Sequence, residues 1–561
     1  MRPKLVFLVI ASMSLLGRPA LAGEQAVYVD GNPRAKLIVA EKSAPPGPIA
    51  ERTINGYLKE QFGWSLPVAT EASEPGLYIV AATDPAHPLL ADLARQGLSL
   101  ATDDLGDEGF RIVTREAGNR RFVVILAATP AGFKYGCQEL VFFHLPATVG
   151  RATIDWPIEV KKRPEFAYRG IYMLPCWSQH DTIASWRRVL RFNSEITVNR
   201  NWFWLNGFPL LKQYGGDYAG TDLSKPENVR PLIALCREER MKFYIGGGWF
   251  TWHHEKHSGG SIDRGVQYYL DMIDLLPGAE GIYLEPAGEG SEAKESVWRE
   301  RTAAFERLAK TVCAKQPQFE FAVAIGKFNA QGYRQAVHAI DAKRIFWWWC
   351  WGDPILQRAL DEHPLVLRWH TNVRMSDYHG SCDPPAEREL ALTGIATSYD
   401  PGQGFGNRWN GYATLWGAPR ARDFHPHTMP YFYQQYWFRE RCWDVRLTEE
   451  RFAPRLARRL FDADVPAEAI QHYVTLSKMC GNPRAVKEHA LAPIDAFVRT
   501  HADRGTPRNR DTLARMREAI DGIRKVRGAA KAKVGQASSL SQAFCLSHAS
   551  SLSHASSLSP R

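Results

Sequence analysis

The chain has 561 residues, of which 45% are hydrophobic and 23% charged, and its formal net charge is +10. Such a composition is ordinary for a soluble globular protein with two or three domains. The first 22 residues hold three basic residues and no acids, so the charge falls to +7 without them. Between Asp503 and Lys533, ten Lys or Arg face four Asp or Glu. The body of the chain is therefore close to neutral, which argues against nucleic-acid binding.

Residues 1–22 are predicted to be a secretory signal. Arg2 and Lys4 precede the apolar stretch Leu5–Leu16, and Ala20-Leu21-Ala22 forms a small-residue cleavage site. We expect a secreted or periplasmic protein whose mature chain begins at Gly23. No later segment approaches the roughly 20 apolar residues that a membrane helix needs, so no stable membrane insertion is expected.

Residues 23–160 are predicted to form a small α+β domain. Strand-like and helix-like stretches alternate there without a motif that carries chemistry. The expected strands are Leu37–Ala40, Gly76–Ala81, Gly109–Val113 and Phe122–Leu126, and the expected helices are Ala50–Phe62 and Ala131–Leu145.

Residues 161–425 are predicted to form a (β/α)8 barrel, because eight short apolar strands are separated by helical stretches. The expected strands are Tyr168–Met173, Ile196–Trp204, Lys242–Ile245, Gly281–Leu284, Phe319–Ile325, Arg344–Trp349, Leu365–Trp369 and Gly394–Ser398. A doubly wound sheet would carry a glycine-rich phosphate loop after an early strand, and the chain has none.

The remainder is predicted to be a helical region over 426–535 and a tail over 536–561. The expected helices are Tyr431–Arg441, Glu449–Phe461, Ala467–Met479 and Asp511–Val526. The tail repeats Ser, Leu, His and Ala in near copies, and such a low-complexity stretch is expected to be disordered.

Glu285 is the first candidate for catalysis. It ends the apolar run Gly281–Leu284 and is followed by Pro286 and Gly288, so it lies at a strand end, where barrel active sites form. Glu289 follows closely and is a second candidate, although an acid there also suits the first turn of the next helix.

A tryptophan-rich segment, Trp347 to Asp353, leads to a second acid. Asp353 is a candidate for activating water, and Trp349 and Trp351 are candidates for stacking on a sugar ring. The alternatives are that Asp353 opens the next helix and that part of the tryptophan run fills the core.

A third segment, Gly246 to His257, follows the third strand. Trp249, His253 and His254 are candidates for substrate contacts there, with plain loop structure as the alternative. The metalloprotease motif His-Glu-x-x-His fails because Ser258 stands where the second histidine belongs. The nine cysteines are scattered without a Cys-x-x-Cys pair, so neither a metal nor a cofactor is predicted.

Polar residues in the second and seventh strands complete the set. Asn201, His370 and Asn372 are candidates for substrate binding, because polar groups in a parallel barrel need partners. Satisfied structural hydrogen bonds are the alternative for each of them.

The sequence also resembles a known group of enzymes. The N-terminal stretches Ala50–Glu60, Asp107–Ile112 and Ala131–Leu140, and the segment Arg163–Gly170, resemble the small domain and the first barrel strand of β-hexosaminidases and α-glucuronidases. The resemblance implies that Arg169 contacts substrate hydroxyls and that Glu285 protonates the leaving oxygen. Asp353 falls near the place, after strand six, where α-glucuronidases carry one of their base carboxylates.

Two departures from these families limit what the resemblance implies. Hexosaminidases carry Asp-Glu at strand four, whereas this chain has Leu284-Glu285, which argues against an acetamido-assisted mechanism. After strand seven, where α-glucuronidases carry a further Glu, this chain has His370 and Asn372, with Asp377 further on.

The sequence thus predicts a glycoside hydrolase that cleaves a polysaccharide or oligosaccharide by carboxylate acid/base catalysis. The alternatives are a carbohydrate-binding barrel without catalysis and a structural surface protein. The sequence leaves the oligomeric state open.

Overall fold

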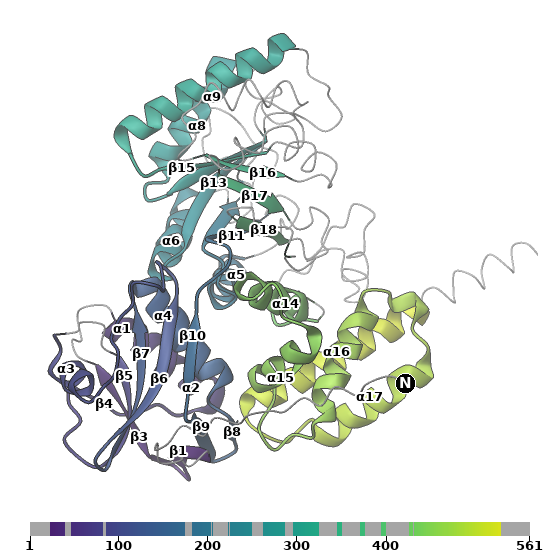
Figure 1. Cartoon of the computed structure of the whole chain (residues 1–561). Coiled ribbons are helices and arrows are strands. Elements are labelled where there is room, and N and C mark those ends of the chain that lie inside the picture. Colours follow the sequence, from purple (N-terminus) through teal and green to yellow (C-terminus); the bar gives the residue numbers. More distant parts are fainter. Residues whose placement is uncertain are drawn as a thin grey trace, which may run out of the picture.

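The computed structural model of the chain describes residues 23–39, 46–81, 86–173, 182–203, 205, 223, 225–248, 262–285, 295–324, 345–349, 371–375, 387, 394–399, 426–429 and 431–528. Along the chain, an N-terminal part with two sheets is followed by a barrel of parallel strands and then by a set of helices (Figure 1).

The N-terminal part contains a larger sheet of order β10-β6-β7-β5-β3-β4 and a smaller one of order β2-β1-β9-β8. The strands are β1 (Gly23–Val29), β2 (Asn32–Pro33), β3 (Ala35–Val39), β4 (Val68–Ala69), β5 (Gly76–Ala81), β6 (Phe110–Ala117), β7 (Arg120–Ala127), β8 (Ala147–Thr148), β9 (Arg151–Trp156) and β10 (Glu159–Lys162). The helices are α1 (Gly47–Ala50), a π-helix (Glu51–Asn55), α2 (Gly56–Phe62), α3 (Pro88–Arg95) and α4 (Pro130–Phe143).

The larger sheet is buried on both faces, as the two-residue alternation of its strands requires. In β5, Ile79 packs into the core that includes α4, while Tyr78 and Val80 pack into a second core with Leu90 and Leu93 of α3. β6 and β7 form the predicted hairpin, which turns at Gly118 with φ +64°, a conformation that glycine adopts without cost.

The barrel is closed, because eight parallel strands pair in chain order and the last returns to the first. The strands are β11 (Tyr168–Met173), β12 (Arg200–Phe203), β13 (Lys242–Gly248), β14 (Gly281–Glu285), β15 (Glu320–Ala324), β16 (Ile345–Trp349), β17 (Thr371–Met375) and β18 (Gly394–Tyr399). The described helices between them are α5 (Ile183–Glu195), α6 (Pro226–Glu238), α8 (Ile262–Leu275) and α9 (Glu295–Lys315).

Side-chain contacts of β15 distinguish the inside of the barrel from the outside. Glu320 accepts hydrogen bonds from Arg200 and Tyr244, which belong to strands across the interior. The next residue, Phe321, packs edge-to-face on Phe305 of α9 with ring centroids 5.6 Å apart. Even-numbered residues of β15 therefore face inward and odd-numbered ones face the helices.

The C-terminal helices contact both the N-terminal part and the barrel. They are α14 (Tyr431–Trp443), α15 (Glu449–Leu460), α16 (Glu468–Cys480), a 3-10 turn (Pro483–Ala485), α17 (Glu488–His501) and a helix over 507–528. Arg459 of α15 donates to Glu195 at the end of α5, and Arg455 pairs with Glu139 of α4 at 3.0 Å. One helix thus holds both the barrel and the N-terminal part.

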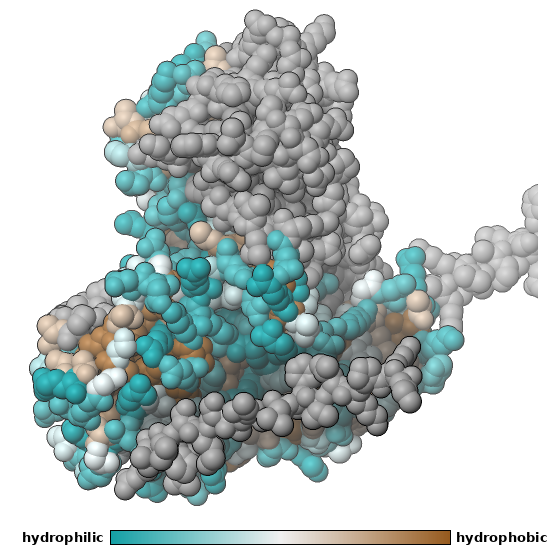
Figure 2. All heavy atoms as spheres, in the orientation of Figure 1, coloured by the Kyte–Doolittle hydropathy of each residue, from teal (hydrophilic) through white to brown (hydrophobic). Residues whose placement is uncertain are grey.

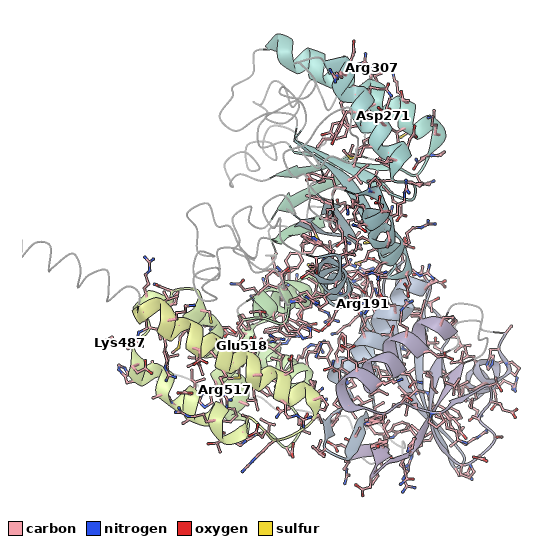
Figure 3. All side chains as sticks on the ribbon, turned by 180° about the vertical axis from the view of Figure 1, so that it is seen from behind. Arg191, Asp271, Arg307, Lys487, Arg517 and Glu518 are labelled. Atoms are coloured by element: carbon pink, nitrogen blue, oxygen red, sulfur yellow. The ribbon has the colours of Figure 1, made fainter. Side chains whose placement is uncertain are left out.

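The surface of the described residues is polar. On the face in Figure 2, hydrophilic residues cover most of the coloured surface, and Val68 and Val149 are the exposed large hydrophobic residues of the described chain. Charged residues such as Asp271 of α8 and Arg307 of α9 lie on the outer side of the barrel helices (Figure 3). None of the described helices has the length and apolar character needed to cross a membrane.

The predicted parallel barrel is confirmed by the strand order. One predicted strand is misplaced, because the seventh strand is β17 over Thr371–Met375 and the predicted segment 365–369 lies outside the described residues. The signal over 1–22 and the tail over 536–561 also lie outside them, so these two interpretations and the domain limits stay predictions.

Candidate active site

The candidate site begins at the carboxyl end of β14, where Glu285 is the last residue of the strand. Its register partner is Gly248, the last residue of β13. The carboxyl ends of the strands are the face of a parallel barrel at which active sites form. The backbone therefore places Glu285 at the end of a strand, as predicted.

Successive residues of a strand point to opposite faces, so the residues before position 285 show which face of β14 that position belongs to. Tyr283, two residues earlier, is buried and stacks on Trp202 of β12 with ring centroids 6.1 Å apart and planes 21° apart. This contact crosses the inside of the barrel, because β13 lies between the two strands. Position 285 therefore has the inward parity of Tyr283.

The backbone of β13 lies close to the backbone of β14 at a glycine. Gly246 is the register partner of Tyr283 and has φ +140°, and a Cβ there would lie 1.9 Å from the Tyr283 carbonyl oxygen. No side chain other than hydrogen fits at this point. The register partners of Tyr283 and Glu285 on β13, Gly246 and Gly248, are thus both glycines.

Below these rings, the amino end of the barrel is filled by a charged cluster around Glu320. Its carboxylate accepts hydrogen bonds from Arg200 Nε at 2.9 Å, from the Lys242 ammonium and from the Tyr244 hydroxyl. Burial opposes ionisation of Glu320, but the charges and hydrogen bonds of Arg200 and Lys242 outweigh it and lower its pKa. The cluster closes the barrel at the end opposite to Glu285.

This interior layer was not predicted, although it has a sequence signal. Arg200, Trp202, Lys242, Tyr244 and Tyr283 recur at alternate positions of three consecutive strands. Two-residue periodicity of large polar and aromatic residues in strands expected to be apolar marks the inner face of a small barrel.

Most predicted site residues lie outside the described residues or in strands described by their backbone alone. Those outside are Glu289, Asp353, Trp249, His253, His254, Trp351, His370 and Asp377. Glu285, Trp349 and Asn372 belong to β14, β16 and β17 respectively.

Arg169 requires a correction. It is the second residue of β11, at the amino end of the strand, and its side chain is fully buried. Its guanidinium donates to Glu108 at 2.8 Å and to the carbonyl oxygens of Thr197 and Phe166, also at 2.8 Å. These partners belong to the junction with the N-terminal part, so the described Arg169 is a structural residue and not the predicted substrate contact.

Asn201 is corrected for a similar reason. It is fully buried, and its Oδ1 accepts a hydrogen bond from Asn193 of α5 at 2.8 Å. Because Arg200 faces the barrel interior, Asn201 has the opposite parity and faces the helices. Its amide is satisfied in the helix layer, as the structural alternative expected.

The register also affects Trp349 and Asn372. Val323 pairs with Trp347, and Trp347 pairs with Asn372, so positions 347, 349 and 372 share the outward parity of Phe321. Asn372 is also the second residue of β17, and residue 370 precedes that strand. The predicted contact at Asn372 relied on a strand ending near 369, and in the observed strand Asn372 lies near the amino end. His370 lies outside the described residues.

No metal centre is found in the part of the chain that the structure describes, since no three His, Cys, Asp or Glu side chains gather there. The five described cysteines are free thiols, and burial raises the pKa of Cys137, Cys236 and Cys480. A thiolate nucleophile would need the opposite shift.

No protein-family model and no curated protein matches the chain. Among solved structures, CpGH84B superposes with a TM-score of 0.53 at 12% identity, covering 87% of this chain and 83% of that one. The GH20 exo-β-N-acetylglucosaminidase of Vibrio harveyi, in complex with N-acetylglucosamine, gives 0.50 at 13% identity over 81% and 78%. The GH20 β-N-acetylhexosaminidase of Streptomyces coelicolor A3(2) gives 0.50 at 12% identity over 78% and 94%. The chain therefore shares the overall fold of β-hexosaminidase-type glycoside hydrolases.

Proposed function

We propose that the protein is a glycoside hydrolase in which Glu285 is the general acid. The observation that carries the proposal is that β14, the fourth strand of a closed parallel barrel, ends on Glu285 with inward parity. Protonation of the leaving oxygen by a carboxylic acid at this place is the chemistry that glycosidic bond cleavage requires. The fold shared with solved glycosidases supports the same class of reaction.

The second carboxylate of the mechanism is proposed to be Asp353. It follows β16 by four residues, on the side of the chain that leaves the carboxyl end of that strand. Asp377, two residues beyond β17, and Glu289, four beyond β14, are two further acids that follow carboxyl ends of strands. A carboxyl separation of about 5 to 5.5 Å would give retention, and one of about 6.5 to 9.5 Å would give inversion.

We propose that the substrate is a glycoside that does not need an acetamido group for cleavage. The Vibrio harveyi and Streptomyces coelicolor enzymes carry N-acetylated sugars in their names. This chain has Leu284 before Glu285, and Leu284 is fully buried with the parity opposite to Tyr283. An apolar side chain cannot orient an amide, so other sugars are the better candidates.

Aromatic and polar residues beyond the strand ends complete the proposed site. Trp249, His253 and His254 follow the glycine end of β13, and Trp351 follows β16. We propose that these four residues contact the sugar. We further propose that residues 1–22 direct the protein out of the cytoplasm, since basic residues, an apolar stretch and a small-residue cleavage site follow one another there.

The test uses a matched pair of variants on one strand. Glu285→Gln is expected to lower kcat/KM about 10²- to 10⁴-fold on a panel of alkyl glycosides, whose leaving groups need a proton, the usual contribution of acid/base catalysis. Glu280→Gln, just before the amino end of β14, removes a carboxyl group whose pKa is raised by burial and which is far from the carboxyl end, and it is expected to leave kcat/KM unchanged. Equal rates for wild type and Glu285→Gln would refute the assignment.

A carbohydrate-binding barrel without catalysis is the second candidate, and Leu284 favours it, because the carboxylate pair of the hexosaminidases is incomplete. The same glycoside panel separates the two. Binding by calorimetry without turnover of any glycoside by the wild type would favour the second candidate.

A further inference from the structure

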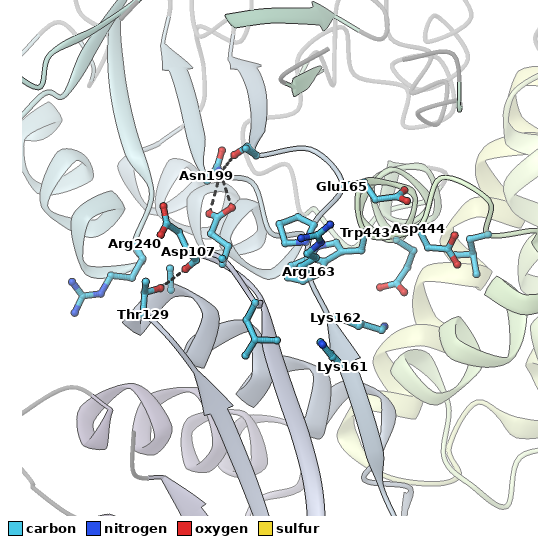
Figure 4. A pocket seen from close by; sticks show the side chains of 18 of the residues that line it. Asp107, Thr129, Lys161, Lys162, Arg163, Glu165, Asn199, Arg240, Trp443 and Asp444 are labelled. Carbon is cyan, nitrogen blue, oxygen red and sulfur yellow. Dashed lines mark hydrogen bonds between the residues drawn. The ribbon is translucent and has the colours of Figure 1, made fainter. Parts of the chain in front are cut away.

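A large pocket lies at the end of the barrel opposite to Glu285, where the three parts of the chain meet. Its volume is about 1280 Å³, and we call it the junction pocket (Figure 4). It is lined by the loop before β6, by β10 and the segment after it, by the amino ends of β12 and β13, and by α14 and α15. Ligand pockets commonly measure about 300 to 1,000 Å³, so this one has room for more than one sugar ring.

Two hydrogen-bonded networks hold its walls. Glu108 accepts from Arg169 at 2.8 Å and from Asn199 at 3.0 Å, which joins the N-terminal part to the barrel. On the opposite wall, Arg455 pairs with Glu440 at 2.7 Å and with Glu139 at 3.0 Å. A pocket with walls fixed in this way is pre-organised for a ligand.

The charges of the lining are largely paired. Eight Lys or Arg and five Asp or Glu line the pocket, and the carboxylates of Asp104, Glu139 and Glu320, which do not line it, pair with further lining cations. Lys161, Lys162, Arg200, Lys242, Arg451 and Arg455 have carboxylate partners. Arg163 and Arg240 are exposed, and no ion pair to either is found within the described part of the chain. Figure 4 shows Arg163 centrally in the pocket, and Arg240 at one end beside Asp107 and Thr129.

Other lining groups suit a ligand that also carries hydroxyl groups. Asp107 and Glu165 present carboxylates, which accept hydrogen bonds from hydroxyl donors. Trp443 also lines the pocket, and its buried indole N–H donates to Thr197 Oγ1 at 2.9 Å. A bare inorganic anion would use the arginines but would be repelled by the two carboxylates.

We propose that the junction pocket is a second carbohydrate site that binds an acidic sugar or short acidic oligosaccharide. The carboxylates of the ligand pair with Arg163 and Arg240, whose planar guanidinium groups suit bidentate contacts. The ring hydroxyls donate to Asp107 and Glu165. The chain's own C-terminal segment is a poor match, because residues 529–561 contain no Asp or Glu.

Calorimetric titration of the full chain with trigalacturonate tests the proposal, because the probe combines carboxylates with hydroxyl groups. Wild type is expected to bind it, and the Arg163→Gln/Arg240→Gln double variant to bind at least about tenfold more weakly, because two charge-assisted contacts are lost. Arg237→Gln is the matched control: this exposed arginine of α6 precedes Arg240 by three residues and does not line the pocket. It should bind like wild type.

The neutral trisaccharide maltotriose and tripolyphosphate complete the experiment. Both are expected to bind at least about tenfold more weakly than trigalacturonate. Trigalacturonate binding that survives the double substitution, or equal binding of tripolyphosphate, would overturn the proposal. The same titrations are repeated with the Glu285→Gln variant. Its binding of trigalacturonate is expected to equal that of wild type, because the junction pocket does not depend on the proposed catalytic acid.

Discussion

The two ends of the barrel are built from different kinds of contact. At the amino end, ion pairs and hydrogen bonds join segments far apart in the chain, such as Glu195 with Arg459 and Glu108 with Arg169. Towards the carboxyl end, β13 offers only glycines beside Tyr283 and Glu285. In parallel barrels the amino-terminal face serves stability and the carboxyl-terminal face serves chemistry. Our proposal places stability at the amino end and catalysis at the carboxyl end, and substitutions at each end can break this contrast.

The largest expected effect on stability comes from the amino end. Glu320→Ala leaves Arg200 and Lys242 without their carboxylate, and breaking such a buried pair typically costs about 3 to 5 kcal/mol. Glu306→Ala is the control, because its pair with Lys310 is on the surface of α9, and about 0.5 kcal/mol or less is expected. Urea unfolding measures both. Similar losses for the two variants would show that the Glu320 cluster does not stabilise the amino end of the barrel.

Gly246→Ala should rank second. The added methyl meets the Tyr283 carbonyl oxygen at 1.9 Å and also disfavours a φ of +140°, so that the cost is expected to be about 2 to 4 kcal/mol. Gly97→Ala has a similar positive φ of +92° but open space around the new methyl, so about 1 kcal/mol is expected. Thermal unfolding of both variants separates the clash from the backbone strain, and an equal loss in both would mean that β13 adjusts freely.

The smallest expected effect is on the free energy of unfolding at low pH. Burial opposes ionisation of Glu195, but the charges of Arg459 and His427 outweigh it and lower its pKa. A carboxyl whose folded pKa is lowered contributes stability above its unfolded pKa of about 4.5, and the contribution is lost as pH falls further towards the folded value. Unfolding free energies of wild type between pH 6 and pH 3 should therefore fall more steeply than those of Glu195→Gln, by at most about 1.4 kcal/mol per pH unit. Parallel profiles would show that Glu195 does not stabilise the junction.

The architecture could be predicted from local patterns, because the strands are short apolar runs. β11 and β5 have the predicted limits, and β14 extends one residue further. β12 begins four residues later than predicted, since Ile196 caps α5 and Thr197 adopts a φ of +59°. α17 was not predicted, although α15, which also contains an internal proline, was.

The site was harder to predict than the fold. Strand-end acids such as Glu285 can be found from chain order alone. The role of Arg169 could not, because its partner Glu108 lies 61 residues away, and this contact depends on how two parts of the chain pack. The junction pocket has the same origin, as it is lined by segments from all three parts.

The central claim, that Glu285 is the acid, is tested most directly by varying the leaving group. A general acid matters little when the leaving group needs no proton, so Glu285→Gln should retain most of its activity on 2,4-dinitrophenyl glycosides. On alkyl glycosides of the same sugar, which leave only with a proton, it should lose about 10² to 10⁴ in kcat/KM. Equal losses on both kinds of substrate, or no loss on either, would contradict the assignment of Glu285 as the acid.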